Sequence, residues 1–182
     1  MKDVGIYKTL RDIRQAFFQL LESDGFRKIT IGKICEVALV SRSTFYSHYQ
    51  DKYDLLEKLV DEYSALFNQL AKQRADAILT AQLNVLSVSE ITNDLKKHQS
   101  EINTLLKVHE EGLDLHARWE QSLDTLWVEV SKSRIKQEVL LTFLSKISSS
   151  LIISYIEWTL ASDEETDAPS KLMESIFTTI YK

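Results

Sequence analysis

Apolar residues recur every three or four positions along most of the chain, which is the spacing of one face of an α-helix. The first such stretch comprises Ile6, Leu10, Ile13, Phe17, Leu20 and Leu21. Asp24-Gly25-Phe26 follows it, and Gly25 suits the left-handed conformation with which helices commonly end. The pattern therefore predicts a first helix that ends near residue 24.

Two short helices and a longer one are expected next. Thr30 and Ser41 each precede a periodic stretch and are placed to act as N-caps. We expect the third helix to run over residues 42–49, and the second to have an inner face made of Ile31, Ile34, Val37 and Ala38. Asp51, with Asp54 three residues on, predicts a capping box at the start of a fourth helix that reaches about residue 74.

The rest of the chain is expected to be helical as well. Serine, aspartate and proline residues stand where helices begin, namely Ser87 or Ser89, Ser100, Asp114 and Pro169. They predict helices starting near residue 90, over 101–108, 115–131 and 135–161, and from 169 to about 181. The polar segment 162–167 is expected to be a loop. Four glycines and a single proline are too few for a fold rich in strands and turns, so we predict an all-α protein.

Composition narrows the protein class. Cys35 is the only cysteine, so the chain forms no internal disulfide and suits a reducing compartment. The N-terminus does not resemble a signal peptide, and the longest apolar stretch, near residues 151–160, is interrupted and short for a bilayer. We therefore expect a cytoplasmic protein with no membrane partner.

The net charge of −5 is unevenly distributed along the chain. Residues 1–55 carry nine Lys and Arg against seven Asp and Glu, whereas residues 56–182 carry thirteen against twenty. A mildly basic N-terminal domain (1–55) joined to an acidic helical domain (56–182) is compatible with a local DNA-binding surface.

The segment from Thr30 to Lys52 has the layout of a helix-turn-helix, whose later helix lies in the major groove of DNA. Three apolar side chains are expected to pack inward: Val40, Phe45 and Tyr49. The polar ones are left to face DNA: Arg42, Ser43, Thr44, Tyr46, Ser47 and His48. Arginine can make two hydrogen bonds to guanine, and Ser and Thr serve bases or phosphates. Lys52, at the start of a helix, is expected to meet a phosphate.

These residues carry a family resemblance. Thr30-x-x-x-Ile34-x-x-x-Ala38-x-Val40-Ser41, then Ser43-Thr-Phe-Tyr-x-His-Tyr49 and Asp51-Lys-x-x-Leu-Leu56, resemble the N-terminal domain of the TetR family over roughly residues 8–60. The resemblance implies DNA contacts by positions 42–44 and 46–48, with Tyr46 and Lys52 on phosphates. The family usually has glycine where Leu39 stands and often alanine where Cys35 stands, so we expect a slightly altered turn backbone at Leu39.

The resemblance also implies a homodimer formed by the last two helices, a palindromic operator and regulation by a small-molecule effector. Four aromatic residues could line an effector cavity or simply form core: Trp119, Trp127, Phe143 and Tyr155. The C-terminal region faintly resembles the group of dihydroxyacetone-kinase regulators, which includes an activator that works through protein contacts.

The resulting hypothesis is a non-enzymatic, sequence-specific transcriptional regulator, expected to be a repressor, that needs no cofactor. One alternative is a protein of the same fold that acts as an adaptor or coactivator through protein partners. Another is a helical enzyme or metal-binding bundle. His109, Glu110 and His116 are candidate ligands for a metal, but their spacing matches no zinc signature.

Overall fold

The computed structural model describes residues 2–79, 88–132, 135–162 and 167–180. Within these ranges the chain forms helices and contains no strand, so the all-α prediction is confirmed. The elements are α1 (Lys2–Asp24), η1 (Phe26–Lys28), α2 (Ile31–Ala38), α3 (Arg42–Tyr46), α4 (Lys52–Leu79), α5 (Val88–Leu95), η2 (Lys96–His98), α6 (Gln99–Leu105), α7 (Leu115–Ser131), α8 (Glu138–Ala161) and α9 (Asp167–Ile180).

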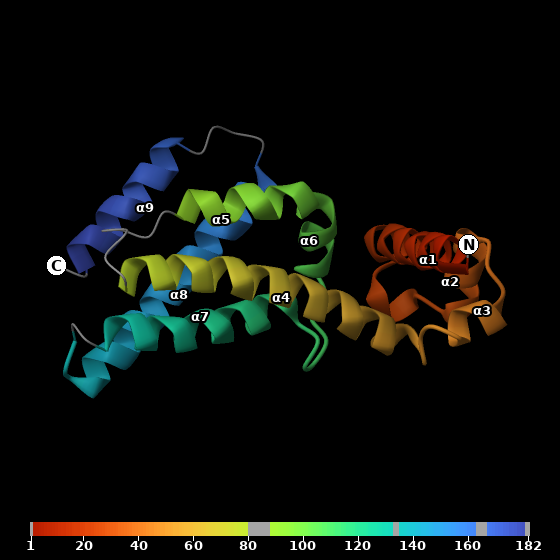
Figure 1. The fold of residues 1–182 in the computed structure, drawn as a ribbon, viewed down its shortest axis with the longest axis horizontal. Coiled ribbons are helices and arrows are strands. Elements are labelled where there is room, and N and C mark those ends of the chain that lie inside the picture. The colour runs from red at the N-terminus through yellow and green to blue at the C-terminus, as the bar shows by residue number, and fades with distance from the viewer. Residues whose placement is uncertain (1, 80–87, 133–134, 163–166, 181–182) are drawn as a thin grey trace.

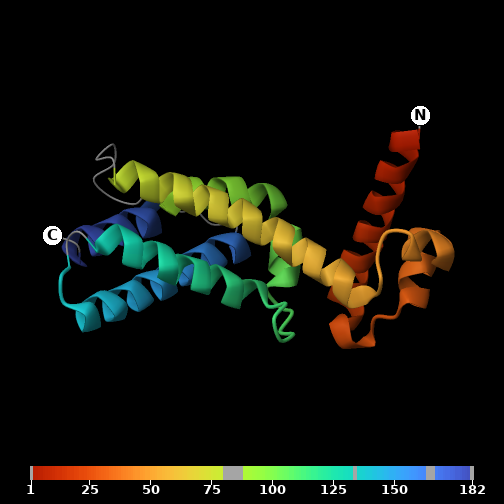
Figure 2. The same ribbon diagram turned by 60° about the horizontal axis from the view of Figure 1, so that its bottom comes forward.

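The helices form two lobes that α4 joins. Figure 1 shows α1, α2 and α3 at one end of the molecule and α5 to α9 at the other, and the turned view of Figure 2 shows the same separation. The predicted domain boundary, between residues 55 and 56, falls in the first turns of α4. A continuous helix therefore passes through that boundary and connects the lobes.

The predicted N-caps are present at several helix starts. The Thr30 hydroxyl accepts a hydrogen bond from the backbone N–H of Lys33 at 3.3 Å, and the Asp114 carboxylate accepts one from that of Ala117 at 3.0 Å. At the start of α4, Asp51 accepts from the backbone N–H of Asp54 at 2.9 Å. These bonds satisfy donors that a helix start would otherwise leave free.

Several details of the expected helices are wrong. The fourth helix continues to Leu79 instead of ending near residue 74, and Ser89 lies inside α5 instead of before it. Val37 is 39% exposed, and Cys35 takes the inner position in its place, because α2 meets α1 along the face of Ile34, Cys35 and Ala38. The third helix ends at Tyr46 instead of residue 49. Ser100 lies inside α6 and does not cap it. Ser87 lies outside the described residues.

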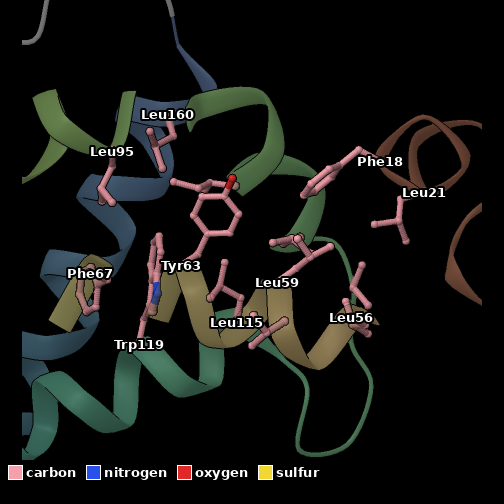
Figure 3. Close-up of a cluster of buried hydrophobic side chains, with 14 of the residues drawn as sticks. Phe18, Leu21, Leu56, Leu59, Tyr63, Phe67, Leu95, Leu115, Trp119 and Leu160 are labelled. Atoms are coloured by element: carbon pink, nitrogen blue, oxygen red, sulfur yellow. The ribbon is translucent and has the colours of Figure 1, made fainter. Parts of the chain in front are cut away.

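The core continues from one lobe into the other along α4. In the larger lobe, Phe67 of α4 stacks on Trp119 of α7, with ring centroids 4.5 Å apart. Figure 3 shows this pair together with Tyr63 and Leu59 of α4. It also shows Phe18 of α1, which lies nearer the smaller lobe. The buried side of α4 therefore packs against both lobes.

By length and composition alone, α8 is long and apolar enough to cross a membrane, and 44% of its most apolar stretch is buried. The sequence-based expectation of no such stretch missed it because the interrupting serines and threonines lower the local hydropathy only slightly. A core helix of a soluble protein meets the same criterion, so this is weak evidence for a membrane segment.

Candidate nucleic-acid interface

A single buried side chain anchors α3, the helix that is expected to face DNA. Phe45 is 0% exposed, and its ring lies 5.5 Å from that of Tyr49. Val40 and Tyr49 are partly buried and pack against the same core. The inward face predicted for this segment is therefore confirmed.

The helix start is held by Ser41, whose hydroxyl accepts from the backbone N–H of Thr44 at 3.0 Å. The hydroxyl groups of Ser41 and Thr44 also lie 2.8 Å apart and share a hydrogen bond. The cap at Ser41 and the buried Phe45 thus fix the orientation of a helix of only five residues.

The polar residues predicted to face DNA lie together on the outside of α3. Arg42, Ser43, Tyr46 and Ser47 are exposed, and Thr44 and His48 are partly exposed. Tyr46 is 55% exposed, so its hydroxyl is available to a partner. The structure thus leaves six of the seven predicted DNA-contacting residues at least partly exposed, on α3 or directly after it.

Arg42 lies across the first turn of α2. A Cβ atom added at Gly32 would come within 3.1 Å of its Nη2 atom. Glycine at this position therefore leaves the room that the guanidinium occupies, and the two helices of the helix-turn-helix together place Arg42.

The turn between α2 and α3 has a left-handed residue at Leu39, with φ 54° and ψ 40°. Its backbone N–H donates to the Glu36 carbonyl at 3.3 Å, and that of Val40 donates to the Cys35 carbonyl at 3.0 Å. The turn thus keeps a conformation that favours glycine even though leucine occupies it. Leu39 is also 92% exposed, so no packing offsets the strain.

The seventh predicted contact, Lys52, has a different environment. Its Nζ atom lies 3.0 Å from the carbonyl oxygen of Phe26, 3.3 Å from that of Arg27 and 3.1 Å from that of Ile29. The ammonium predicted to meet a phosphate therefore already has acceptors within the protein.

A polar cluster connects the two lobes beside α4. Arg14 of α1 binds Glu62 of α4 at 2.7 Å and Glu101 of α6 at 3.2 Å. The Tyr63 hydroxyl lies between them, accepting from Arg14 and donating to Glu101. His98 adds an aromatic contact, with its ring 5.7 Å from that of Tyr63. Any shift of α6 relative to α4 would disturb these bonds.

The cluster changes the acidity of its members. Burial alone would raise the pKa of Glu101, but hydrogen bonds from Tyr63 and Arg14 hold it below its ordinary value. Burial and the hydrogen bond to Glu101 raise the pKa of Tyr63. The cluster therefore contains a charged arginine, a charged carboxylate and a neutral phenol at neutral pH. The sequence alone does not reveal this cluster, because its members lie far apart along the chain.

Three of the four aromatic residues considered for an effector cavity are core residues. Trp119 is 0% exposed, and Trp127 and Tyr155 are each 6% exposed. Trp127 stacks on Phe177 of α9, with centroids 5.2 Å apart and planes nearly parallel. Phe143 is 60% exposed and so lies outside the core that the other three share.

Trp127 also lines a small apolar cavity with seven aliphatic side chains from α4, α5, α7 and α8. The cavity has a volume of about 20 Å³, which is room for about one water molecule. A larger molecule would have to push the surrounding helices apart to enter it.

α8 and α9 each expose large apolar residues that the sequence pattern did not separate from the core. They are Val139, Leu140, Phe143, Trp158 and Leu172. Along α8 the spacing of residues 140, 143 and 158 matches one helical face. These five residues are exposed large hydrophobic residues of the described part of the larger lobe, and they are here called the α8–α9 apolar face.

His109 and His116, two of the candidate metal ligands, pair with different carboxylates. His109 pairs with Asp114 at 2.8 Å, and His116 lies 3.6 Å from Glu157. The described residues include no group of three or more side chains placed to hold a metal ion. Cys35 is buried, and burial raises the pKa of its thiol.

Comparisons with known proteins agree with this geometry. Residues 13–59 match the family described as bacterial regulatory proteins, tetR family. The uncharacterized HTH-type transcriptional regulator YxbF of Bacillus subtilis (strain 168) is 30% identical over 98 residues, which are 54% of this chain and 23% of that protein. The chain thus spans less than a quarter of that relative's length.

Two solved structures resemble the whole chain. A TetR transcriptional regulator from Streptococcus agalactiae 2603V is 27% identical with a TM-score of 0.66, and the match covers 100% of this chain and 97% of that one. The dihydroxyacetone kinase operon activator DhaS is 16% identical with a TM-score of 0.57, covering 95% and 96%. The second similarity shows a shared fold.

Proposed function

This chain belongs to the tetR family of bacterial regulatory proteins, and from that premise we propose that it binds specific DNA sequences as a cytoplasmic transcriptional repressor. The observation that carries the proposal is the outer face of α3, where Arg42, Ser43, Tyr46 and Ser47 are exposed around the buried Phe45. Arg42 and Ser43, at the helix start, are proposed to read base edges with Thr44 and His48. Tyr46 and Ser47 are proposed to contact the phosphate backbone.

We propose that the active form is a homodimer. One helix of five residues reads few base pairs, and helix-turn-helix proteins commonly solve this by presenting two such helices to half-sites about 34–36 Å apart. The α8–α9 apolar face supports the proposal, because large exposed apolar patches commonly mark protein interfaces. A two-fold dimer would recognise a palindromic operator.

An effector is a further part of the proposal. A small apolar molecule that enlarges the cavity beside Trp127 would move α5, α7 or α8 relative to α4. The cluster of Arg14, Tyr63 and Glu101 provides a physical connection from α6 to α1. Such a ligand would release DNA only to the extent that it binds the non-DNA-bound spacing of the lobes more tightly.

Selection of bound fragments from a random-sequence DNA library by the full-length protein tests the DNA-binding proposal. We expect enrichment of a two-fold symmetric sequence. Ser43→Asp should abolish enrichment, because a carboxylate suits the first turn of α3 but repels phosphates. Ser100→Asp is the matched control, since Ser100 is also exposed and lies in the first turn of α6.

The selection has a clear negative outcome. If the wild-type protein enriches no sequence while remaining folded and dimeric, DNA recognition is refuted, and the adaptor or coactivator function becomes the better hypothesis. Enrichment of an asymmetric sequence would retain DNA binding and refute the symmetric dimer.

A further inference from the structure

The ammonium of Lys52 is saturated by carbonyl groups of its own chain. A lysine ammonium has three N–H donors, and Lys52 Nζ lies within hydrogen-bonding distance of three acceptors, the carbonyl oxygens of Phe26, Arg27 and Ile29. The distances of 3.0, 3.3 and 3.1 Å are ordinary for such bonds. No donor on Nζ is left for another ligand unless one of these bonds breaks.

Two aromatic rings hold the same charge in place. Nζ lies 4.6 Å from the centroid of the Phe26 ring and 5.4 Å from that of Tyr53. The two rings pack edge to face, 5.1 Å apart, and Phe26 is only 6% exposed. A cation over aromatic faces is stabilised, and the rings restrict where its side chain can turn.

The three carbonyl groups that accept from Lys52 lie in the segment directly before α2. Phe26 and Arg27 belong to η1, and Ile29 directly precedes Thr30, the N-cap of α2. Lys52 is the first residue of α4. The side chain therefore ties the beginning of α4 to the segment that determines where α2 begins.

A second lysine makes a related contact at the other end of the helix-turn-helix. Lys58 Nζ donates to the His48 carbonyl at 3.1 Å and to Asp54 at 3.0 Å. It also lies 4.9 Å from the centroid of the Tyr49 ring. The first two turns of α4 thus hold the chain before α2 through Lys52 and the chain after α3 through Lys58.

We propose that Lys52 is a positioning residue of the DNA-binding lobe, whose ammonium fixes the segment 26–29 against α4, and that it is not a phosphate contact. The inference rests on the proposed function only in assuming that the lobe which Lys52 positions binds DNA. The contacts between the Lys52 ammonium and the three carbonyl groups are present in the protein without DNA. Lys52 therefore affects DNA binding through the placement of α2 and of Arg42, which lies over the first turn of α2.

The wild-type protein offers the most direct test, by NMR of its lysine ammonium groups after ¹⁵N-lysine labelling. The Lys52 ammonium should give a signal protected from exchange with water in the free protein. It should keep its chemical shift when the DNA duplex enriched by the wild-type protein is added. A through-bond coupling from its nitrogen to a ³¹P nucleus, or rapid exchange in the free protein, would overturn the proposal.

Variants provide a second test. Lys52→Met keeps the aliphatic stem and removes the donors. Lys97→Met is the control, because Lys97 is exposed and pairs with Asp94 in the larger lobe. In the absence of DNA, we expect Lys52→Met to lower the Tm by about 3–8 °C and to speed amide exchange over residues 26–34. Lys97→Met should leave both quantities near their wild-type values.

With the enriched duplex, Lys52→Met should weaken binding without changing the slope of log K against log salt concentration. A slope smaller by about one, with the free protein unchanged, is the result expected of a lost phosphate contact and would refute the proposal. Should Lys52→Met fail to fold, the wild-type NMR measurement decides. If no duplex is bound at all, the proposed function fails, whereas the measurements on the free protein still test the positioning role.

Discussion

We expect Phe143→Asp to convert the proposed homodimer into a monomer. The side chain is 60% exposed in the single chain. An aromatic side chain buries roughly 200 Å² when fully covered, so on the order of 120 Å² remains for an interface to cover. At about 25 cal/mol per Å² this burial is worth about 3 kcal/mol per side chain. Two-fold symmetry doubles the figure to about 6 kcal/mol per dimer, or about four orders of magnitude in Kd.

Sedimentation equilibrium or light scattering across a concentration series measures this effect directly. Leu39→Asp is the matched control, since Leu39 is 92% exposed but lies in the smaller lobe. It should leave the association constant unchanged. A dimer of unchanged affinity in Phe143→Asp, or a monomeric wild-type protein, would refute the assignment of the α8–α9 apolar face as the interface.

Three further substitutions test local features of the structure. Leu39→Gly should raise the free energy of unfolding by about 0.5 kcal/mol in urea titrations, since relief of left-handed strain outweighs the greater freedom of glycine when unfolded; a clear loss of stability would contradict the strain. Arg42→Ala should weaken operator binding by about 1–3 kcal/mol and relax preference at one base position per half-site, measured by anisotropy on single-base variants; equal weakening on all sequences would argue against base reading. Asp114→Ala should cost about 1 kcal/mol at pH 7, because it removes the N-cap of α7. Burial alone would raise the pKa of Asp114, but hydrogen bonds from His109 and the Ala117 amide hold it below its ordinary value. The ionised Asp114 carboxylate therefore stabilises the fold fully above its unfolded-state pKa, near 4. This contribution to the free energy of unfolding is lost as the pH falls through the folded-state pKa. The difference between wild type and variant should shrink towards pH 3, and a constant difference would refute the carboxylate's role.

Much of α3, the proposed recognition helix, could be predicted from sequence because its determinants are local. The inward Phe45 and the outward Arg42, Ser43 and Tyr46 follow from helical spacing alone. Gly32 carried no such signal, because the room it leaves for Arg42 exists only where α2 and α3 meet.

The fold class was determined by sequence, and so were the helix starts at Thr30, Ser41, Asp51 and Asp114, because an N-cap bonds to backbone groups only two or three residues ahead. The tertiary structure decided which side of each helix is buried. It exchanged Val37 for Cys35 in the core and left Phe143 at the surface.

Tertiary structure also decided which polar groups meet. Lys52 finds carbonyl groups about 25 residues earlier in the chain, and Arg14 finds Glu101, 87 residues later. Neither pairing follows from spacing along a helix, because each depends on how separate helices pack. The sequence placed these charges on their helices. Only the packing of α4 against the segment 26–29, and of α1 against α4 and α6, gave each one its partner.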